Sequence, residues 1–149
     1  MMKIYGLIQF FAAFLAVIFF SITLEVNKKF IIYAGITGAI GWIIYYVLVY
    51  IGISVTIASL ISAIIIAMVS YIFSKLFNVL TTLFLIPGIL PIVPGIAMYR
   101  MVYYFFSNNM QEAKFYLFQA ITIAGAIALG IFIVESITNI KLYKKEIIK

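Results

Sequence analysis

Few side chains in this sequence could bind a polar ligand or carry a proton, because most of the chain is apolar. Arg100 is the only arginine, and its planar guanidinium can hold a carboxylate through two parallel hydrogen bonds. Glu135 is the only acid inside an apolar stretch, where a desolvated carboxyl group could gain and lose a proton near neutral pH. Gln119 and Thr122 could hydrogen-bond to substrate hydroxyls, although such side chains more often bond to neighbouring helices.

Two interpretations stay open for each of the two charged residues. Arg100 either binds a substrate carboxylate or extends to the outer membrane interface among neighbouring tyrosines. Glu135 either couples a transport process to protons or is a solvated carboxylate at a membrane face, since Lys141 follows it closely.

The segment LFLIPGILPIVPGIAMYR, from Leu83 to Arg100, combines the residues that most often interrupt helices. All the prolines of the chain and two of its glycines lie there: Pro87, Gly88, Pro91, Pro94 and Gly95. Each proline removes a backbone donor and clashes with the carbonyl four residues before it, while glycine permits non-helical angles. The pattern predicts two half-helices, about 79–86 and 95–106, joined by an unwound stretch.

Unwound backbone inside a membrane must be buried in protein or line a wet cavity, because lipid cannot satisfy its peptide groups. The second half-helix would start near Gly95, with free N–H donors and a positive dipole end that suit a carboxylate. Free carbonyls near Ile86 could accept from an ammonium group or hold a cation. An amino acid carries both groups. The alternative is a helix that its prolines merely kink, which membrane helices tolerate.

The composition excludes several classes of function. Of 149 residues, 67% are hydrophobic and 9% are charged, against about 25% charged in a soluble domain. Cysteine and histidine are absent, which removes thiolate and imidazole metal ligands, a cysteine nucleophile and the common neutral-pH base. We therefore expect no enzyme, no cofactor and no metal site. The net charge of +6 comes largely from lysines that flank apolar stretches, which favours membrane lipid over nucleic acid.

The fold class that follows is all-α: a polytopic membrane protein, a five-helix bundle whose fourth helix is broken by proline and glycine. Residues 1–149 are expected to form a single transmembrane domain. Its predicted spans are about 4–24, 31–51, 54–74, 79–106 and 115–138. The first span is longer than the apolar part of a typical signal peptide, so we expect a retained helix.

The basic residues predict the orientation in the membrane. Five crossings would place seven lysines on one side: Lys28, Lys29, Lys75, Lys141, Lys144, Lys145 and Lys149. The other side would receive Lys3, Lys114 and, at most, Arg100. By the positive-inside rule, the C-terminus is then cytoplasmic. A re-entrant fourth segment would nearly remove this bias.

Small residues recur at helical spacing and predict close helix packing. The three sets are Gly35, Gly38 and Gly41; Ser59, Ala63 and Ala67; and Ala120, Ala124 and Ala128, the last accompanied by Gly125 and Gly130.

The motif IPGILPIVPGIAMY, followed by a polar turn and a small-residue last helix, resembles the compact membrane part of the threonine/serine exporter family. GITGAIGWIIYYV resembles the glycine-rich second helix of that family, and the order of features agrees over about residues 5–140. The resemblance carries onto Pro87, Gly88, Pro91, Pro94, Gly95 and Tyr99 as site residues. It does not extend to Arg100, because some family members carry an uncharged residue there.

The resemblance implies a five-helix unit that pairs with a second five-helix exporter subunit in a bacterial plasma membrane. Together the two would export threonine and serine, or in some members a dicarboxylate such as succinate. No nucleotide-binding motif is present, so we expect a secondary exporter driven by the proton-motive force. Self-assembly into a homo-oligomer stays open, and so does a non-transporting scaffold whose helix break binds lipid or another protein.

Overall fold

The computed structural model describes the backbone of residues 2–147 and the side chains of residues 5–138. Its elements are α1 (Met2–Thr23), α2 (Lys28–Tyr50), α3 (Val55–Phe77), α4 (Thr82–Ile89), the short 3-10 helix η1 (Leu90–Ile92), α5 (Gly95–Phe106) and α6 (Met110–Ile147). No strand occurs within residues 2–147. The chain is therefore an all-helical protein, as its composition predicts.

Four helices are long and apolar enough to cross a membrane: they contain Tyr5–Thr23, Ile31–Tyr50, Val55–Phe77 and Met110–Thr138. The segments Thr82–Ile92 and Gly95–Phe106 pass the same test together, with a bend of 49° between them. The fold is that of a polytopic helical membrane protein with four continuous helices and one broken helix.

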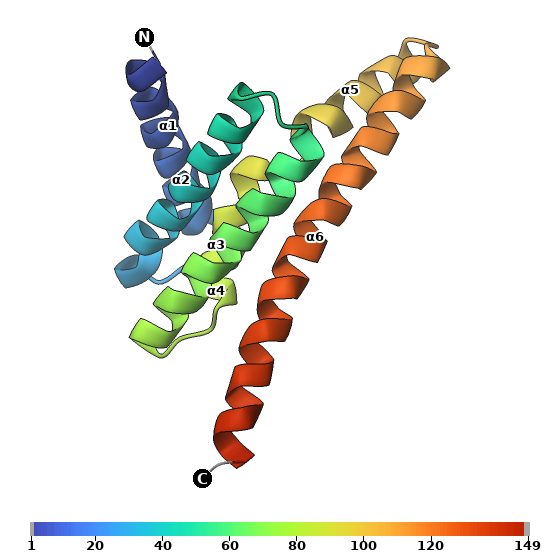
Figure 1. Ribbon diagram of the computed structural model, residues 1–149. Coiled ribbons are helices and arrows are strands. Elements are labelled where there is room, and N and C mark those ends of the chain that lie inside the picture. Colours follow the sequence, from blue (N-terminus) through green and yellow to red (C-terminus); the bar gives the residue numbers. More distant parts are fainter. Residues whose placement is uncertain (1, 148–149) are drawn as a thin grey trace.

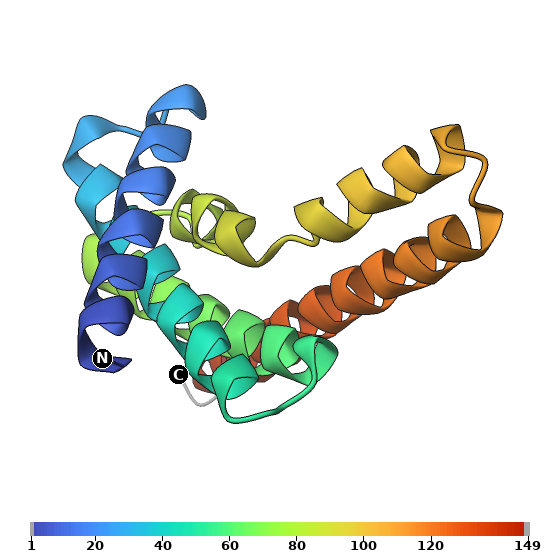
Figure 2. The ribbon, with the colours of Figure 1, turned by 90° about the horizontal axis from the view of Figure 1, so that it is seen from above.

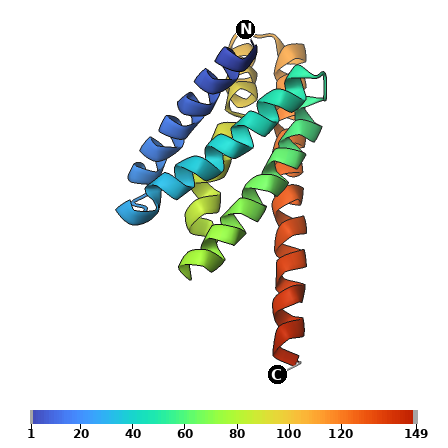
Figure 3. The same ribbon diagram turned by 60° about the vertical axis from the view of Figure 1, so that its left-hand side comes forward.

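The two halves of the broken helix run in the same general direction (Figures 1 and 3). The pair therefore leads from the end of the molecule where α6 finishes to the end where α1 starts. Lys28 begins α2 and Lys75 lies in the last turn of α3, both at the end where α6 finishes. Two of the seven lysines that five crossings would place on one side, Lys28 and Lys75, therefore lie at the same end of the described structure.

Polar residues in the connections cap the ends of several helices. Asn27 accepts a hydrogen bond from the Lys29 N–H at 3.1 Å, and Ser54 accepts one from the Ile57 N–H at 3.4 Å. Asn78 ends α3 in the left-handed conformation, with φ of 53°, which an asparagine adopts more readily than most residues. Polar residues between the apolar stretches thus fix the starts of α2 and α3 and the end of α3.

Glycines allow α2 to lie close to α1. Gly35 and Gly38 are buried, and a Cβ added to either would collide with the side chains of Phe14 or Val17 on α1. Because lipid provides no hydrophobic drive between helices, such close approach is what holds them together.

The other face of α2 packs against α3 and α4. A Cβ at Gly41 would collide with Ile66 of α3, and the Ser62 hydroxyl of α3 donates to the Gly41 carbonyl at 2.6 Å. On α4, Gly88 lies beside Thr37 of α2, where an added Cβ would come within 3.1 Å of the threonine methyl group. The small residues of α2 and α3 therefore pack as the sequence predicts.

The prediction for the last helix is only partly right. Ala120 is buried, but Ala124 and Ala128 are exposed, and no described residue lies within 4 Å of a Cβ added to Gly125. The buried face of α6 instead includes Ile123, Ile127 and Gly130. Gly130 lies against α3, with the Leu60 carbonyl oxygen 2.9 Å from the position of an added Cβ.

The helices α5 and α6 form an arm that projects away from α1 and α2 (Figure 2). Among the described elements, α5 packs against α6 alone, whereas α4 packs against α1, α2 and α3. The bend in the broken helix therefore separates α4, which packs against three helices, from α5, which packs against α6 alone among the described elements.

Candidate functional site

The interruption of the fourth helix is short and lies at Val93 and Pro94. The helical path continues through Pro87 to Ile89 and then, as η1, to Ile92. Pro94 has φ of −74° and ψ of 47°, and the Gly95 N–H donates to the Val93 carbonyl at 2.7 Å, which together make an inverse γ-turn.

This geometry corrects the predicted half-helices. The first half begins at Thr82 rather than 79 and continues beyond residue 86, so the unwound stretch is shorter than expected. The physical reason is the position of two prolines: Pro91 lies in the first turn of η1 and Pro94 caps α5, where a backbone donor is not needed. The second half starts at Gly95, as predicted.

The break leaves peptide groups without partners. The first intrahelical bond of α5 runs from the Met98 N–H to the Pro94 carbonyl at 3.0 Å. The N–H groups of Ile96 and Ala97 have no hydrogen-bond acceptor within the described part of the chain. Across the break, the carbonyls of Pro91 and Ile92 likewise receive no donor. Unpaired donors and unpaired acceptors therefore lie within seven residues of each other, from Pro91 to Ala97, in the described part of the chain.

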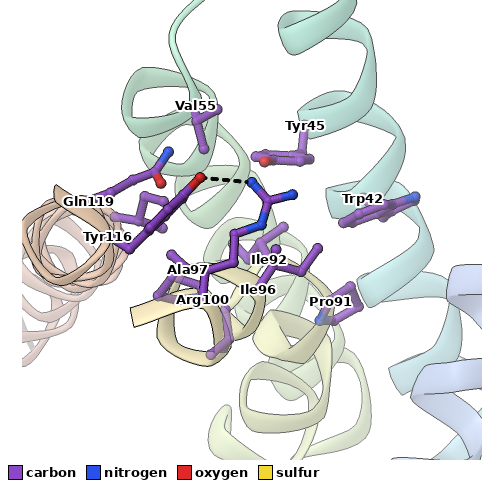
Figure 4. Close-up of a pocket in the computed structure, with 13 residues that line it drawn as sticks. Trp42, Tyr45, Val55, Pro91, Ile92, Ile96, Ala97, Arg100, Tyr116 and Gln119 are labelled. Carbon is purple, nitrogen blue, oxygen red and sulfur yellow. Dashed lines mark hydrogen bonds between the residues drawn. The ribbon is translucent and has the colours of Figure 1, made fainter. Parts of the chain in front are cut away.

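A cavity of about 220 Å³ lies beside this break (Figure 4). Its walls come from η1, α5, α2, the start of α3 and the first half of α6. Ile96 and Ala97, whose N–H groups are unpaired, belong to the lining.

Arg100 points into the cavity toward Tyr45 and Trp42 of α2 (Figure 4). One guanidinium nitrogen donates to the Tyr116 hydroxyl at 3.2 Å, and the guanidinium carbon lies 5.4 Å from the centre of the Tyr116 ring. Tyr116 is itself stacked on Tyr104, with 5.5 Å between ring centres. Since a guanidinium has five N–H donors, this packing orients Arg100 and leaves donors for a carboxylate.

The structure brings together some of the predicted site residues. The cavity is lined by Pro91, Pro94, Arg100 and Gln119. Gly95 is the first residue of α5, which forms one wall of the cavity.

Other predicted residues lie elsewhere. Pro87 and Gly88 are buried, with Gly88 against α2 and α3. Tyr99 is 71% exposed, and the Thr122 hydroxyl donates to the Gln119 carbonyl at 2.9 Å, so neither lines the cavity. Glu135 lines a different cavity near the opposite end of α6.

Sequence reasoning missed three aromatic residues of the site, Trp42, Tyr45 and Tyr116. Trp42 and Tyr45 stack with 5.3 Å between ring centres, and the Trp42 indole N–H donates to the Gln9 side-chain oxygen on α1 at 2.9 Å. Their three-residue spacing on one helix is the only sequence signal that could have paired them.

Removing the hydrogen bond to Trp42 is expected to change its fluorescence. In Gln9→Leu, the indole N–H loses its partner, and stability should fall by about 0.6–1.7 kcal/mol. Trp42 is the only tryptophan, so its emission maximum reports this position alone. The matched control Gln111→Leu, at an exposed position on α6, should leave the emission unchanged. Identical spectra for both variants would contradict the hydrogen bond.

Within the described residues, no group of three or more acidic, cysteine or histidine side chains could hold a metal ion. The candidate site is therefore made of an arginine, an amide, aromatic rings and unpaired peptide groups.

A discontinuous helix that turns its peptide groups toward a polar cavity is an arrangement that secondary transporters use to bind their substrates. Fold and site thus define a polytopic membrane protein of the transporter class. The family model described as Threonine/Serine exporter, ThrE, matches residues 9–137, and the chain belongs to this family. Comparison with curated proteins and with solved structures gave no match. The chain is thus a multi-pass membrane component of a threonine/serine exporter.

Proposed function

We propose that the cavity at the helix break is where this exporter component binds its amino-acid substrate. The observation that carries the proposal is that Arg100 lines one cavity together with Ile96 and Ala97, whose N–H groups have no acceptor within the described residues. Positive charge and free donors at a helix N-terminus favour a carboxylate.

The remaining groups fit the rest of a hydroxy amino acid. The substrate ammonium is bound by the carbonyls of Pro91 and Ile92 and by the faces of Trp42 and Tyr45. Gln119 is placed to hydrogen-bond the side-chain hydroxyl of threonine or serine.

A second five-helix subunit would complete the pathway. Substrate sites of secondary transporters usually lie between two structural repeats, and the helices of this chain supply one such repeat. The side of α5 that faces away from α6 has no neighbour among the described elements, which leaves room for a partner there.

The proposed location is the bacterial plasma membrane. The end of the protein that carries Lys28 and Lys75, and where α6 finishes, is called the lysine-rich end, and we place it in the cytoplasm. The driving force is the proton-motive force, with Glu135 as the proposed coupling residue.

Transport assays test this function directly. Inverted membrane vesicles should accumulate labelled threonine and serine when they contain both subunits, and deletion of this chain should abolish the accumulation. An uncoupler should abolish it as well. Succinate accumulation in place of threonine would reassign the substrate to a dicarboxylate, and unchanged threonine flux after deletion would refute the proposal.

The helix break itself is expected to be required for transport. In Pro94→Ala, the cap residue regains a helix-compatible backbone and a donor, so α4 and α5 can join and cover the unpaired groups. Threonine accumulation should fall about tenfold or more, equivalent to at least ~1.4 kcal/mol. A scaffold function predicts instead that Pro94→Ala keeps full flux and changes only the assembly of the complex.

A further inference from the structure

A second polar cavity, of about 310 Å³, lies at the lysine-rich end of the protein. It is formed by the last turns of α3, the start of α4 and the second half of α6. Its polar lining is Ser74, Lys75, Thr81, Glu135 and Thr138.

The cavity presents one cation and one anion together with hydroxyl groups. Lys75 is exposed, and its ammonium group lies 5.4 Å from the centre of the Tyr71 ring. Glu135 is exposed on α6 and lines the same cavity. The Ser74 hydroxyl donates to the Val79 carbonyl, so its lone pairs stay available as acceptors. This pairing of charges is complementary to a zwitterion.

The two polar cavities lie along the same packed helices. Gln119 lines the first and Glu135 the second, and their separation of sixteen positions on α6 corresponds to ~24 Å at 1.5 Å per residue. Ile92 and Ile123 line the first cavity, and Leu85 lines the second.

These three side chains belong to one buried apolar cluster with Ile66 and Ile127. Apolar packing therefore separates the two cavities, which is the arrangement expected when each opens to a different membrane face.

We infer that the cavity at the lysine-rich end is a second binding site for an α-amino acid zwitterion. Lys75 binds the carboxylate, and Thr81 is available to the substrate hydroxyl. Glu135, the proposed coupling residue, binds the ammonium group while its carboxylate is ionised and releases it when it takes up the coupled proton. This inference rests on the proposed transport function, and it makes the second cavity the place where substrate enters before it passes the apolar cluster.

Exchange measurements with defined sidedness test the site. In vesicles that contain the complete exporter, Lys75→Gln and Glu135→Gln should each raise the half-saturating threonine concentration about tenfold at the lysine-rich face. The value at the opposite face should stay unchanged. The control Lys114→Gln, an exposed lysine at the other end of α6, should alter neither value. Active exchange with no effect of the Lys75 and Glu135 variants would overturn the second site and leave the proposed function standing.

A labelling experiment tests the site without transport. The chain contains no cysteine, so Thr138→Cys introduces a single thiol into the cavity. Millimolar threonine should slow its reaction with a membrane-impermeant maleimide added at the lysine-rich face, and adding Lys75→Gln should remove that protection. If threonine leaves the labelling rate unchanged, the second site is overturned, whether or not the wild-type complex shows exchange. If the wild-type complex shows no threonine exchange but threonine still slows the labelling, the result counts against the proposed function and not against the second site.

Discussion

Replacing Arg100 with glutamine is expected to lower threonine export between about tenfold and a hundredfold. Among the described residues, Arg100 is the only charged side chain in the lining of the cavity at the helix break, and Tyr116 holds its guanidinium in place. Hydrogen bonds to charged groups contribute about 1.5–3 kcal/mol, which corresponds to a loss of this size. Initial rates of labelled threonine accumulation in inverted vesicles measure the effect.

Arg100→Lys and Lys114→Gln serve as controls. Lysine keeps the charge but lacks the planar fork, so Arg100→Lys should give an intermediate rate. Lys114→Gln removes a charge that does not line the cavity and should keep the wild-type rate. If Arg100→Gln, expressed at the wild-type level, also exports at the wild-type rate, Arg100 lies at the membrane interface and does not bind substrate.

Enlarging Gly130 is expected to separate α6 from α3. A leucine there would bring its Cβ within 2.9 Å of the Leu60 carbonyl oxygen and within 3.0 Å of the Ala63 Cβ, and backbone cannot move aside as a flexible side chain can. Overpacking of this kind costs about 1–3 kcal/mol. Because Gly130 lies on α6 between the two cavities, Gly130→Leu should both lower thermal stability and reduce export. Heating the purified complex and measuring the fraction that stays monodisperse tests the first effect.

Gly125→Leu is the matched control on the same helix. A Cβ at Gly125 has no neighbour within 4 Å, so the same substitution should be tolerated. Equal losses for the two variants would mean that α6 is sensitive to any lost glycine, and the close crossing at Gly130 would then not be the cause.

The helical spans could be predicted from the sequence because their signals are local. An apolar stretch of about twenty residues between polar caps becomes a membrane helix wherever its neighbours lie. The packing of Gly35, Gly38 and Gly41 was also predictable, since every one of them lies on a buried part of α2. The burial of small residues on α6 could not be predicted, because they lie on several faces of the helix. Contact with α3 decides that Gly130 is buried and Gly125 is not.

The extent of the helix break could not be predicted from its prolines alone. The helical path continues through Pro87 inside α4 and through Pro91 in the first turn of η1, so only the backbone at Val93 and Pro94 leaves it. Likewise, Tyr116 of α6 and Trp42 of α2 line the same cavity because of where the 49° bend of the broken helix places α5, and a bend angle leaves no local signal in the sequence.

Hydrogen–deuterium exchange at the amides of Ile96 and Ala97, followed by mass spectrometry of the complete exporter, tests most directly whether the broken helix offers its peptide groups to a polar substrate. We predict rapid exchange there, in contrast to the centre of α3, and a clear slowing when threonine is added. Exchange as slow as in the centre of α3, or a rate that threonine leaves unaltered, would contradict the account.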